Sequence, residues 1–246
     1  GKLEVRERSH VARILHDDSG KVTGVEYFDK DGKLQMQKAR IVAVAGNSFE
    51  SPRLLLNSAS GKFANGLANS SGMVGKNYMR HTTGSVYAIF DKPVKMWRGT
   101  TMAGIVQDEA RHDPSRGFVG GYELETLALG LPFMAAFLNP GGWGRSFTSA
   151  LDHYENMAGM WIVGEDMPQL KNGVTLSDTK DQHGLPVANV HFDDHPNDVA
   201  MRNHAYKQGI AMYEAVGATR AFPTPPYPST HNLGTNRMSE KPEDGV

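Results

Sequence analysis

The residues best suited to chemistry lie near the C-terminal end of the sequence, where His231 is followed by Gly234 and Thr235 in a His-x-x-Gly-Thr pattern. Imidazole changes charge near neutral pH, so His231 is a candidate general base that removes a proton from a hydroxyl group. Gly234 allows a tight turn that brings bare backbone close to that imidazole. A loop histidine that only bonds a nearby carbonyl is the alternative, and the spacing alone leaves both open.

A second candidate site follows an apolar segment in the first quarter of the chain. Ile41–Ala45 is apolar without alternation, which predicts a central parallel strand buried on both faces. Gly46 ends this segment, and a helix is expected to start with Ser51 as N-cap and Pro52 in the first turn. A strand, a glycine and a helix start in succession let a phosphate-bearing ligand meet bare backbone. Ala45 and Gly46 are therefore candidates for close approach to a nucleotide.

The elements that position these residues are expected to be mostly strands. Turn-forming residues at 17–20 and 29–32 predict an antiparallel β-meander over residues 3–46. A helix is expected from about residue 196 to 216, because apolar residues form a broad face there and Gly217 follows. Further strands are expected within 84–90, 100–107, 117–124, 160–164, 174–176 and 187–192.

Composition excludes several classes of function. The 246 residues carry 26 Lys and Arg against 27 Asp and Glu, so no global attraction to nucleic acid or to an anionic membrane is expected. The absence of Cys rules out disulfides and thiolate chemistry. No run of about 18 apolar residues occurs, so no bilayer-spanning segment is expected. No histidine spacing indicates a metal site, and neither the cytoplasm nor the periplasm is favoured.

Several segments spread along the whole chain occur together in one order. They are residues 11–14 with 20–25, 39–46, 51–58, 74–81, 164–169 and 231–238. Together they resemble the glucose-methanol-choline (GMC) family of FAD-dependent oxidoreductases, and they are most similar to its bacterial sugar, polyol and gluconate-type dehydrogenases. Each segment alone is a weak signal, whereas their common order is a specific one.

The resemblance implies an α/β fold in two parts, with α+β character in the second. One part is a partial FAD-binding domain with a Rossmann-like core, expected over residues 1–82 and again over 224–246. The other is a substrate-binding domain, expected over 83–223, in which helices back an antiparallel sheet.

The resemblance also implies the reaction and the cofactor. FAD would accept a hydride at N5 from the carbinol carbon of an alcohol, such as a sugar, polyol or cyclitol, while His231 takes the hydroxyl proton. Val11 falls where the family reads the adenine edge with a strand's backbone, and Ala45, Gly46, Gly234 and Thr235 fall near the flavin cofactor.

Substrate contacts are predicted at Asn232 and Tyr122. Tyr122 and Glu123 are adjacent on an expected strand, so at most one of them should face the substrate. Surface or core packing is the alternative for every residue of this group. Further candidates for the same pocket are His81, Glu123, Phe133 and Trp161.

The chain departs from the family pattern at both ends. It contains no G-x-G-x-x-G fingerprint after a strand, and the family's continuation with a second active-site His or Asn is not in this sequence. We therefore expect an internal piece of a longer enzyme, whose remaining N- and C-terminal polypeptide completes the FAD site, with an electron-acceptor subunit as a further candidate partner. A non-catalytic carbohydrate-binding or interaction fragment without FAD is the alternative, and a pyridine-nucleotide enzyme is a weaker one.

Overall fold

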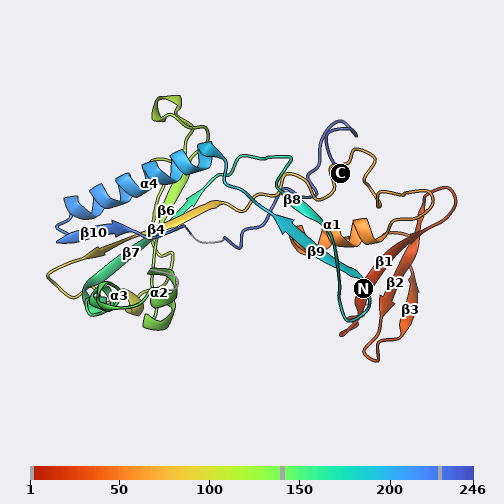
Figure 1. The fold of residues 1–246 in the computed structure, drawn as a ribbon, viewed down its shortest axis with the longest axis horizontal. Coiled ribbons are helices and arrows are strands. Elements are labelled where there is room, and N and C mark those ends of the chain that lie inside the picture. Colours follow the sequence, from red (N-terminus) through yellow and green to blue (C-terminus); the bar gives the residue numbers. More distant parts are fainter. Residues whose placement is uncertain (1–2, 139–141, 227–228) are drawn as a thin grey trace. The chain divides into compact units, whose positions relative to one another are not determined.

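The computed structural model describes residues 3–138, 142–226 and 229–246 of the chain, which fold as two compact units (Figure 1). Unit 1 comprises residues 1–79, 168–193 and 232–246, and unit 2 comprises residues 80–167 and 194–231. This division differs from the expected domains at residues 80–82, 168–193 and 224–231. The hairpin formed within 168–193 packs on the helix of unit 1, whereas residues 224–231, with His231, belong to unit 2. Within the described residues, no helix is both long enough and apolar enough to cross a membrane.

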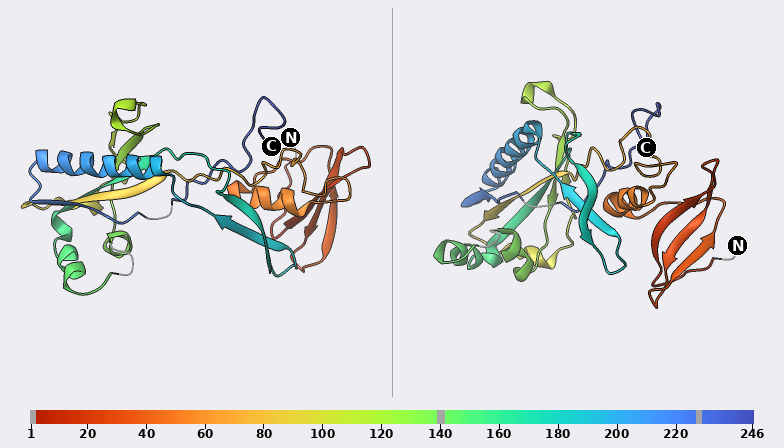
Figure 2. Two further views of the ribbon diagram at one scale, coloured as in Figure 1. Left: turned by 45° about the horizontal axis from the view of Figure 1, so that its top comes forward. Right: turned by 45° about the vertical axis from the view of Figure 1, so that its right-hand side comes forward.

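Unit 1 places one helix between a three-stranded sheet and a hairpin, as Figure 2 shows. The expected β-meander is present as an antiparallel sheet in the order β1-β2-β3. The core contains Ile14, Leu55, Leu67 and Val74. The elements of this unit are β1 (His10–His16), β2 (Val22–Phe28), β3 (Leu34–Lys38), α1 (Asn47–Asn57), β8 (Gly173–Lys180) and β9 (Pro186–His191).

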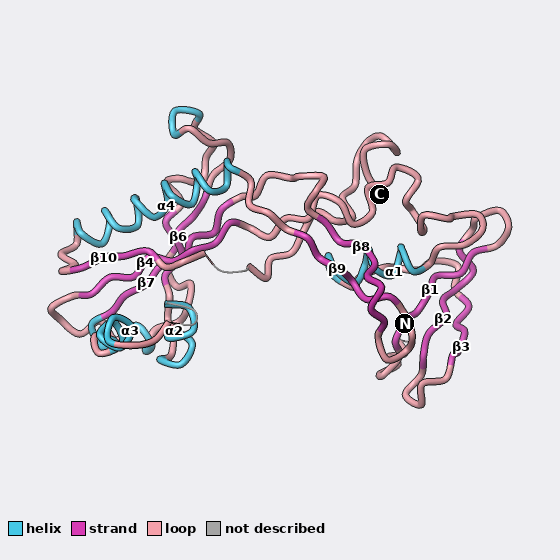
Figure 3. Tube along the Cα trace, viewed as in Figure 1, coloured by secondary structure: helices cyan, strands magenta, loops and turns pink. Residues whose placement is uncertain are grey.

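The expected strand at Ile41–Ala45 is not part of a sheet in the described residues, and Figure 3 draws the segment before α1 as a loop. The expectation that both faces are buried is wrong, because Ile41 is 86% exposed. Val42 and Val44 pack against the core of unit 1, so only one side of the segment is covered. A strand needs a neighbour for its backbone groups, and the described residues supply none here.

Helix α1 begins earlier than the sequence predicts. It starts at Asn47, whose Oδ1 accepts hydrogen bonds from the backbone N–H groups of Phe49 and Glu50. Asn47 adopts a left-handed backbone conformation (φ 63°), which asparagine tolerates better than most residues. Ser51 is therefore not the N-cap, and its hydroxyl instead accepts from the N–H of Gly46.

The early start places Pro52 inside α1, where proline removes one helical hydrogen bond. The carbonyl that loses its donor is that of Ser48, four residues earlier. Thr235 Oγ1 donates to this carbonyl at 2.8 Å, and Thr235 is only 1% exposed. Thr235 therefore supplies the hydrogen bond that Pro52 cannot donate to the helix.

Arg53 joins α1 to the hairpin of β8 and β9. Its side chain is 9% exposed, and its guanidinium donates to Asp181 Oδ2 at 2.6 Å and to the Pro186 carbonyl at 2.8 Å. Burial alone would raise the pKa of Asp181, but hydrogen bonds from Arg53 and from the backbone N–H groups of Leu185 and His183 outweigh it, so this pKa lies below its usual value.

We expect Asp181→Asn to lower the free energy of unfolding by about 1–3 kcal/mol near neutral pH, since a charged hydrogen bond to Arg53 is lost. A lowered pKa stabilises the fold above the unfolded value of about 4, and this contribution is lost as pH falls through the folded pKa. The difference between the two proteins in urea unfolding should therefore shrink on acidification. Glu50→Gln removes the exposed partner of Arg53 and should cost less than about 1 kcal/mol. Equal losses for both variants would contradict this account.

Unit 2 is an antiparallel five-stranded sheet in the order β10-β4-β7-β6-β5. Helix α4 lies on one face, and α2 and α3 lie on the other (Figure 2). Met201 and Ala205 of α4 pack against the first face, and Met134 of α2 packs against the second. Its elements are β4 (Thr82–Ile89), η1 (Met96–Arg98), β5 (Ile105–Val106), η2 (Pro114–Arg116), β6 (Tyr122–Thr126), α2 (Leu131–Leu138), α3 (Arg145–Leu151), η3 (Tyr154–Asn156), β7 (Met157–Gly164), α4 (Pro196–Ala215) and β10 (Arg220–Pro223).

The long helix of unit 2 is the element that the sequence predicts best. Pro196 occupies its first turn, and the side chain of His195 accepts a hydrogen bond from the N–H of Asn197. Gly217 follows the helix with φ 90°, a conformation that glycine adopts without strain. The expected strand over 100–107 is much shorter, since only β5 pairs there.

Candidate active site and nucleotide pocket

Two histidines meet in unit 2 although 150 positions separate them. Nδ1 of His231 lies 3.0 Å from Nδ1 of His81, and the two rings meet edge to face at an interplanar angle of 86°. His231 is exposed, whereas His81 is partly buried and lies directly before β4. The predicted base is therefore held through Nδ1, and no hydrogen bond to its Nε2 is found among the described residues.

His81 lines a cleft of about 200 Å³ at the end of the sheet of unit 2. Glu123 and Glu165 also line this cleft, beside uncharged residues such as Ala110 and Val163. In the sheet, Glu123 pairs with Val163 and Glu125 pairs with Trp161. Because side chains alternate along a strand, Glu123 and Glu125 share the face of β6 that looks away from α4.

Two buried polar atoms on this face have no hydrogen-bond partner among the described residues. They are Oε2 of Glu125 and Nε1 of Trp161. Burial raises the pKa of Glu125, the carboxyl group of Glu123 adds to this, and His231 opposes it. Glu125 is therefore close enough to His231 to interact with it electrostatically, from the same face of β6 as Glu123.

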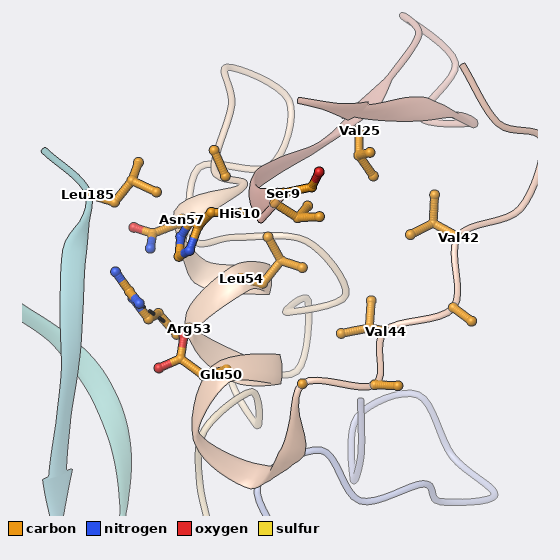
Figure 4. A pocket seen from close by; sticks show the side chains of 15 residues that line it. Ser9, His10, Val25, Val42, Val44, Glu50, Arg53, Leu54, Asn57 and Leu185 are labelled. Atoms are coloured by element: carbon orange, nitrogen blue, oxygen red, sulfur yellow. Dashed lines mark hydrogen bonds and ion pairs between the residues drawn. The ribbon is translucent and has the colours of Figure 1, made fainter. Parts of the chain in front are cut away.

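Unit 1 contains a separate pocket of about 360 Å³, shown in Figure 4. Val11, Ala45 and Gly46, three residues predicted to contact the cofactor, all line it. Val42, Val44 and Leu54 form its apolar wall in Figure 4, and Glu50, Arg53 and His10 lie together at another side. The structure thus brings β1, the segment before α1 and α1 itself around one cavity.

The pocket fits part of a nucleotide cofactor. Its volume is near the lower end of the roughly 300–1,000 Å³ typical of small-molecule sites, so it matches an adenosine-sized group and not a whole dinucleotide. Within the described residues, the backbone groups of residues 41–45 pair with no strand, which leaves them for a ligand. A small side chain at Ala45 keeps this edge accessible.

Comparison with known proteins identifies the family to which this arrangement belongs. Two family models, both described as GMC oxidoreductase, match residues 2–83 and 168–246. The chain belongs to the GMC oxidoreductase family. The prediction from the ordered segments is therefore confirmed, as is the FAD cofactor expected of a member of this family.

Similar GMC proteins include two bacterial dehydrogenases. A 2-methyl-1,2-propanediol dehydrogenase from Mycolicibacterium austroafricanum is 35% identical, over 99% of this chain and 46% of its own length. A gluconate 2-dehydrogenase flavoprotein from Pantoea cypripedii is 28% identical, over 98% of this chain and 43% of its own length. The chain thus spans a little under half the length of these relatives.

The fold agrees with that of a solved GMC-type flavoprotein. A formate oxidase from Aspergillus oryzae superposes with a TM-score of 0.63 at 15% identity, over 97% of this chain and 52% of that one. This likeness confirms the expected α/β fold class. Among the described residues, every pair of neighbouring strands is antiparallel.

The residues that follow His231 in the His-x-x-Gly-Thr pattern are anchored within unit 1. Asn232 Oδ1 accepts a hydrogen bond from the hydroxyl of Tyr78 at 2.6 Å, and its carbonyl accepts from Ser48. Gly234 has φ 95°, and a Cβ there would overlap the carbonyl of Asn77. These bonds explain the asparagine, glycine and threonine as packing residues, and their contacts to substrate or FAD stay predictions.

The side chain of Tyr122 lies on the opposite face of β6 from Glu123. Its ring is buried in the core beneath α4, and its hydroxyl lies 2.9 Å from Nδ1 of His204. Burial, with a smaller effect of Glu109, raises the pKa of this phenol. The phenol therefore has a partner within the core, although Tyr122 and Glu123 both line the cleft of unit 2. The side chain of Phe133 lies outside the described residues.

Glu165 and Glu125 are residues at this site that the sequence analysis did not single out. The spacing Glu123-x-Glu125 would have revealed Glu125, because residues two apart share one face of a strand. Val42, Val44 and Leu54 in the nucleotide pocket are likewise ordinary apolar residues without a chemical signature. Within the described part of the chain, no three His, Asp or Glu residues gather as metal ligands would.

Proposed function

We propose that the protein containing this chain is an FAD-dependent oxidoreductase that oxidises a CH–OH group of a polyol or sugar, with His231 as general base. The observation that carries the proposal is the pairing of His231 with His81 beside a cleft that Glu123 and Glu165 also line, in a chain of the GMC family. The names of the related propanediol, gluconate and fructose dehydrogenases support an alcohol as substrate class.

In the proposed mechanism, His231 accepts the hydroxyl proton at Nε2, because Nδ1 is already bonded to His81. FAD, when bound, supplies the acceptor for the hydride that leaves the carbinol carbon. Glu123 and Glu125 would bind further hydroxyl groups of the substrate and orient the reacting carbon. Two carboxyl groups on one face suit a hydroxyl-rich molecule, since each hydroxyl can donate to them.

Val11, Ala45 and Gly46 would hold the adenosine side of FAD in the pocket of unit 1. The proposed contacts at Val11 and Gly46 use the backbone, so the side-chain size at Ala45 is the property that mutation can change.

We expect Ala45→Leu to weaken FAD retention by about tenfold or more, because the larger side chain occupies volume that the nucleotide needs. The measurement is the FAD released from purified protein on dilution, followed by flavin fluorescence. Ala64→Leu makes the same change at an exposed alanine of unit 1 away from the pocket, and it should leave retention unchanged. Equal retention in all three proteins would show that FAD does not occupy this pocket.

The proposed reaction is tested by mixing the FAD-loaded protein with vicinal diols, aldonates and ketoses in the absence of oxygen. One carbonyl product should form for each FAD reduced with at least one of these classes. Binding of a carbohydrate to protein that carries no FAD, with no product from any class, would instead support the non-catalytic alternative.

A further inference from the structure

We propose that His81 is a positioning residue that selects the tautomer of His231 in which Nδ1 carries the proton and Nε2 is free. This inference rests on the proposed function, because it explains how His231 is prepared to act as a base. It assigns no contact between His81 and the substrate.

The bond between the two rings admits few protonation states. Two Nδ1 atoms 3.0 Å apart form a hydrogen bond only if one carries a proton and the other offers a lone pair. If His231 accepts the substrate proton at Nε2, a neutral His231 must carry its own proton on Nδ1. His81 is then the acceptor at Nδ1, and its own proton resides on Nε2.

The alternative arrangement would block catalysis. If His81 donated its Nδ1 proton, a neutral His231 would accept at Nδ1 and carry a proton at Nε2. That nitrogen could not then take a proton from a hydroxyl group. Fixing the tautomer of a catalytic histidine through its second nitrogen is a known task of neighbouring groups.

The backbone at His81 is built to hold the ring in place. His81 has a left-handed conformation (φ 60°), which is unfavourable for a residue with a bulky side chain. Asp166 holds both neighbours of this residue, because its two carboxylate oxygens accept from the N–H of Arg80 and from the hydroxyl of Thr82, each at 2.7 Å. Strain that the surroundings hold in this way often marks a functional position.

Other charged groups on this face act on His231 without a hydrogen bond to its ring among the described residues. Glu125 interacts with His231 electrostatically, and Glu123 lies next to Glu125 on the same face of β6. A negative charge favours a protonated imidazole but does not distinguish its two nitrogens. Selection of the tautomer therefore falls to His81.

The test compares His81→Asn with His81→Gly in the FAD-loaded protein. Both residues tolerate a left-handed backbone, so both variants should fold and keep FAD. Asn can place its side-chain oxygen near the position of Nδ1 and accept the proton of His231, whereas Gly offers no acceptor. The two variants therefore separate the hydrogen bond from the backbone conformation.

The first readout is the nitrogen NMR shifts of the His231 ring, assigned by their loss in His231→Gln. The proton of His231 should reside on Nδ1 in the unmodified protein and in His81→Asn, and it should shift toward Nε2 in His81→Gly. Flavin reduction should slow by roughly one to two orders of magnitude in His81→Gly and recover in part in His81→Asn.

A proton on Nε2 of His231 in the unmodified protein, or an unchanged tautomer in His81→Gly, would overturn this inference. The failure of the proposed function looks different, since flavin reduction would then not depend on His231 at all.

Discussion

Replacing His231 by Ala is expected to slow the reduction of bound FAD by an alcohol by about 10²–10⁴-fold, while FAD stays bound. The reason is that the substitution removes the imidazole proposed to take the hydroxyl proton, and a hydride leaves an alkoxide far more readily than a neutral alcohol. The measurement is the single-turnover rate of flavin bleaching without oxygen, together with the FAD content of the purified variant.

His153→Ala is the matched control, because His153 is an exposed histidine of the same unit, away from the cleft. It should reduce FAD at the rate of the unmodified protein. A His231→Ala protein that reduces FAD at an undiminished rate would remove His231 from the mechanism, and a loss of FAD in this variant would assign the residue to cofactor binding instead.

Gly234→Val is expected to lower the free energy of unfolding by about 3–5 kcal/mol, among the largest effects of a single substitution. Two costs add at this position. The backbone has φ 95°, which a β-branched residue strongly disfavours, and the new Cβ would overlap the carbonyl of Asn77. The hydrogen bond from Thr235 to Ser48 and the pairing of Leu233 with Met79 should be lost with it.

Gly32→Val separates these two costs, because Gly32 also has a positive φ (72°) but no atom lies within 4 Å of a Cβ placed there. It should cost only the backbone strain, about 1–2 kcal/mol. The comparison is made by urea unfolding of both variants. Similar losses in the two would mean that the close approach to Asn77 does not explain the glycine of the His-x-x-Gly-Thr motif.

Local features of the fold could be predicted from sequence because short segments determine them. Asp17 and Asp29 each accept backbone N–H groups two and four residues ahead, so the turns of the meander arise from their own residues. The long helix of unit 2 carries its own start and end signals at Pro196 and Gly217. These elements need no distant partner to be recognised.

Features that depend on distant residues were harder to predict. The segment Ile41–Ala45 has the composition of a buried strand, but it is a strand only if another segment pairs with it. The start of α1 depends on the left-handed backbone of Asn47. Pro52 is tolerated inside this helix because Thr235 donates a hydrogen bond to the carbonyl of Ser48. No local pattern contains that information.

The candidate site likewise combines features set by local sequence with features set by distant residues. The motif alone singled out His231, whose role as a base stays a prediction. Alternation places the side chains of Tyr122 and Glu123 on opposite faces of β6, but both residues line the cleft at the end of the strand. The packing of α4 buries the ring of Tyr122 on one of these faces, which the sequence alone could not show. The partnership of His81 with His231 follows only from the fold, because the two residues are 150 positions apart.

The measurement that tests the central claim most directly is the bleaching of bound FAD by an alcohol without oxygen, followed for the same alcohol with hydrogen or deuterium on its carbinol carbon. We predict that FAD is reduced by a diol, aldonate or ketose, and that it is reduced more slowly when the carbon carries deuterium. FAD that stays oxidised with every alcohol tested would contradict the assignment of this chain to an alcohol-oxidising flavoenzyme.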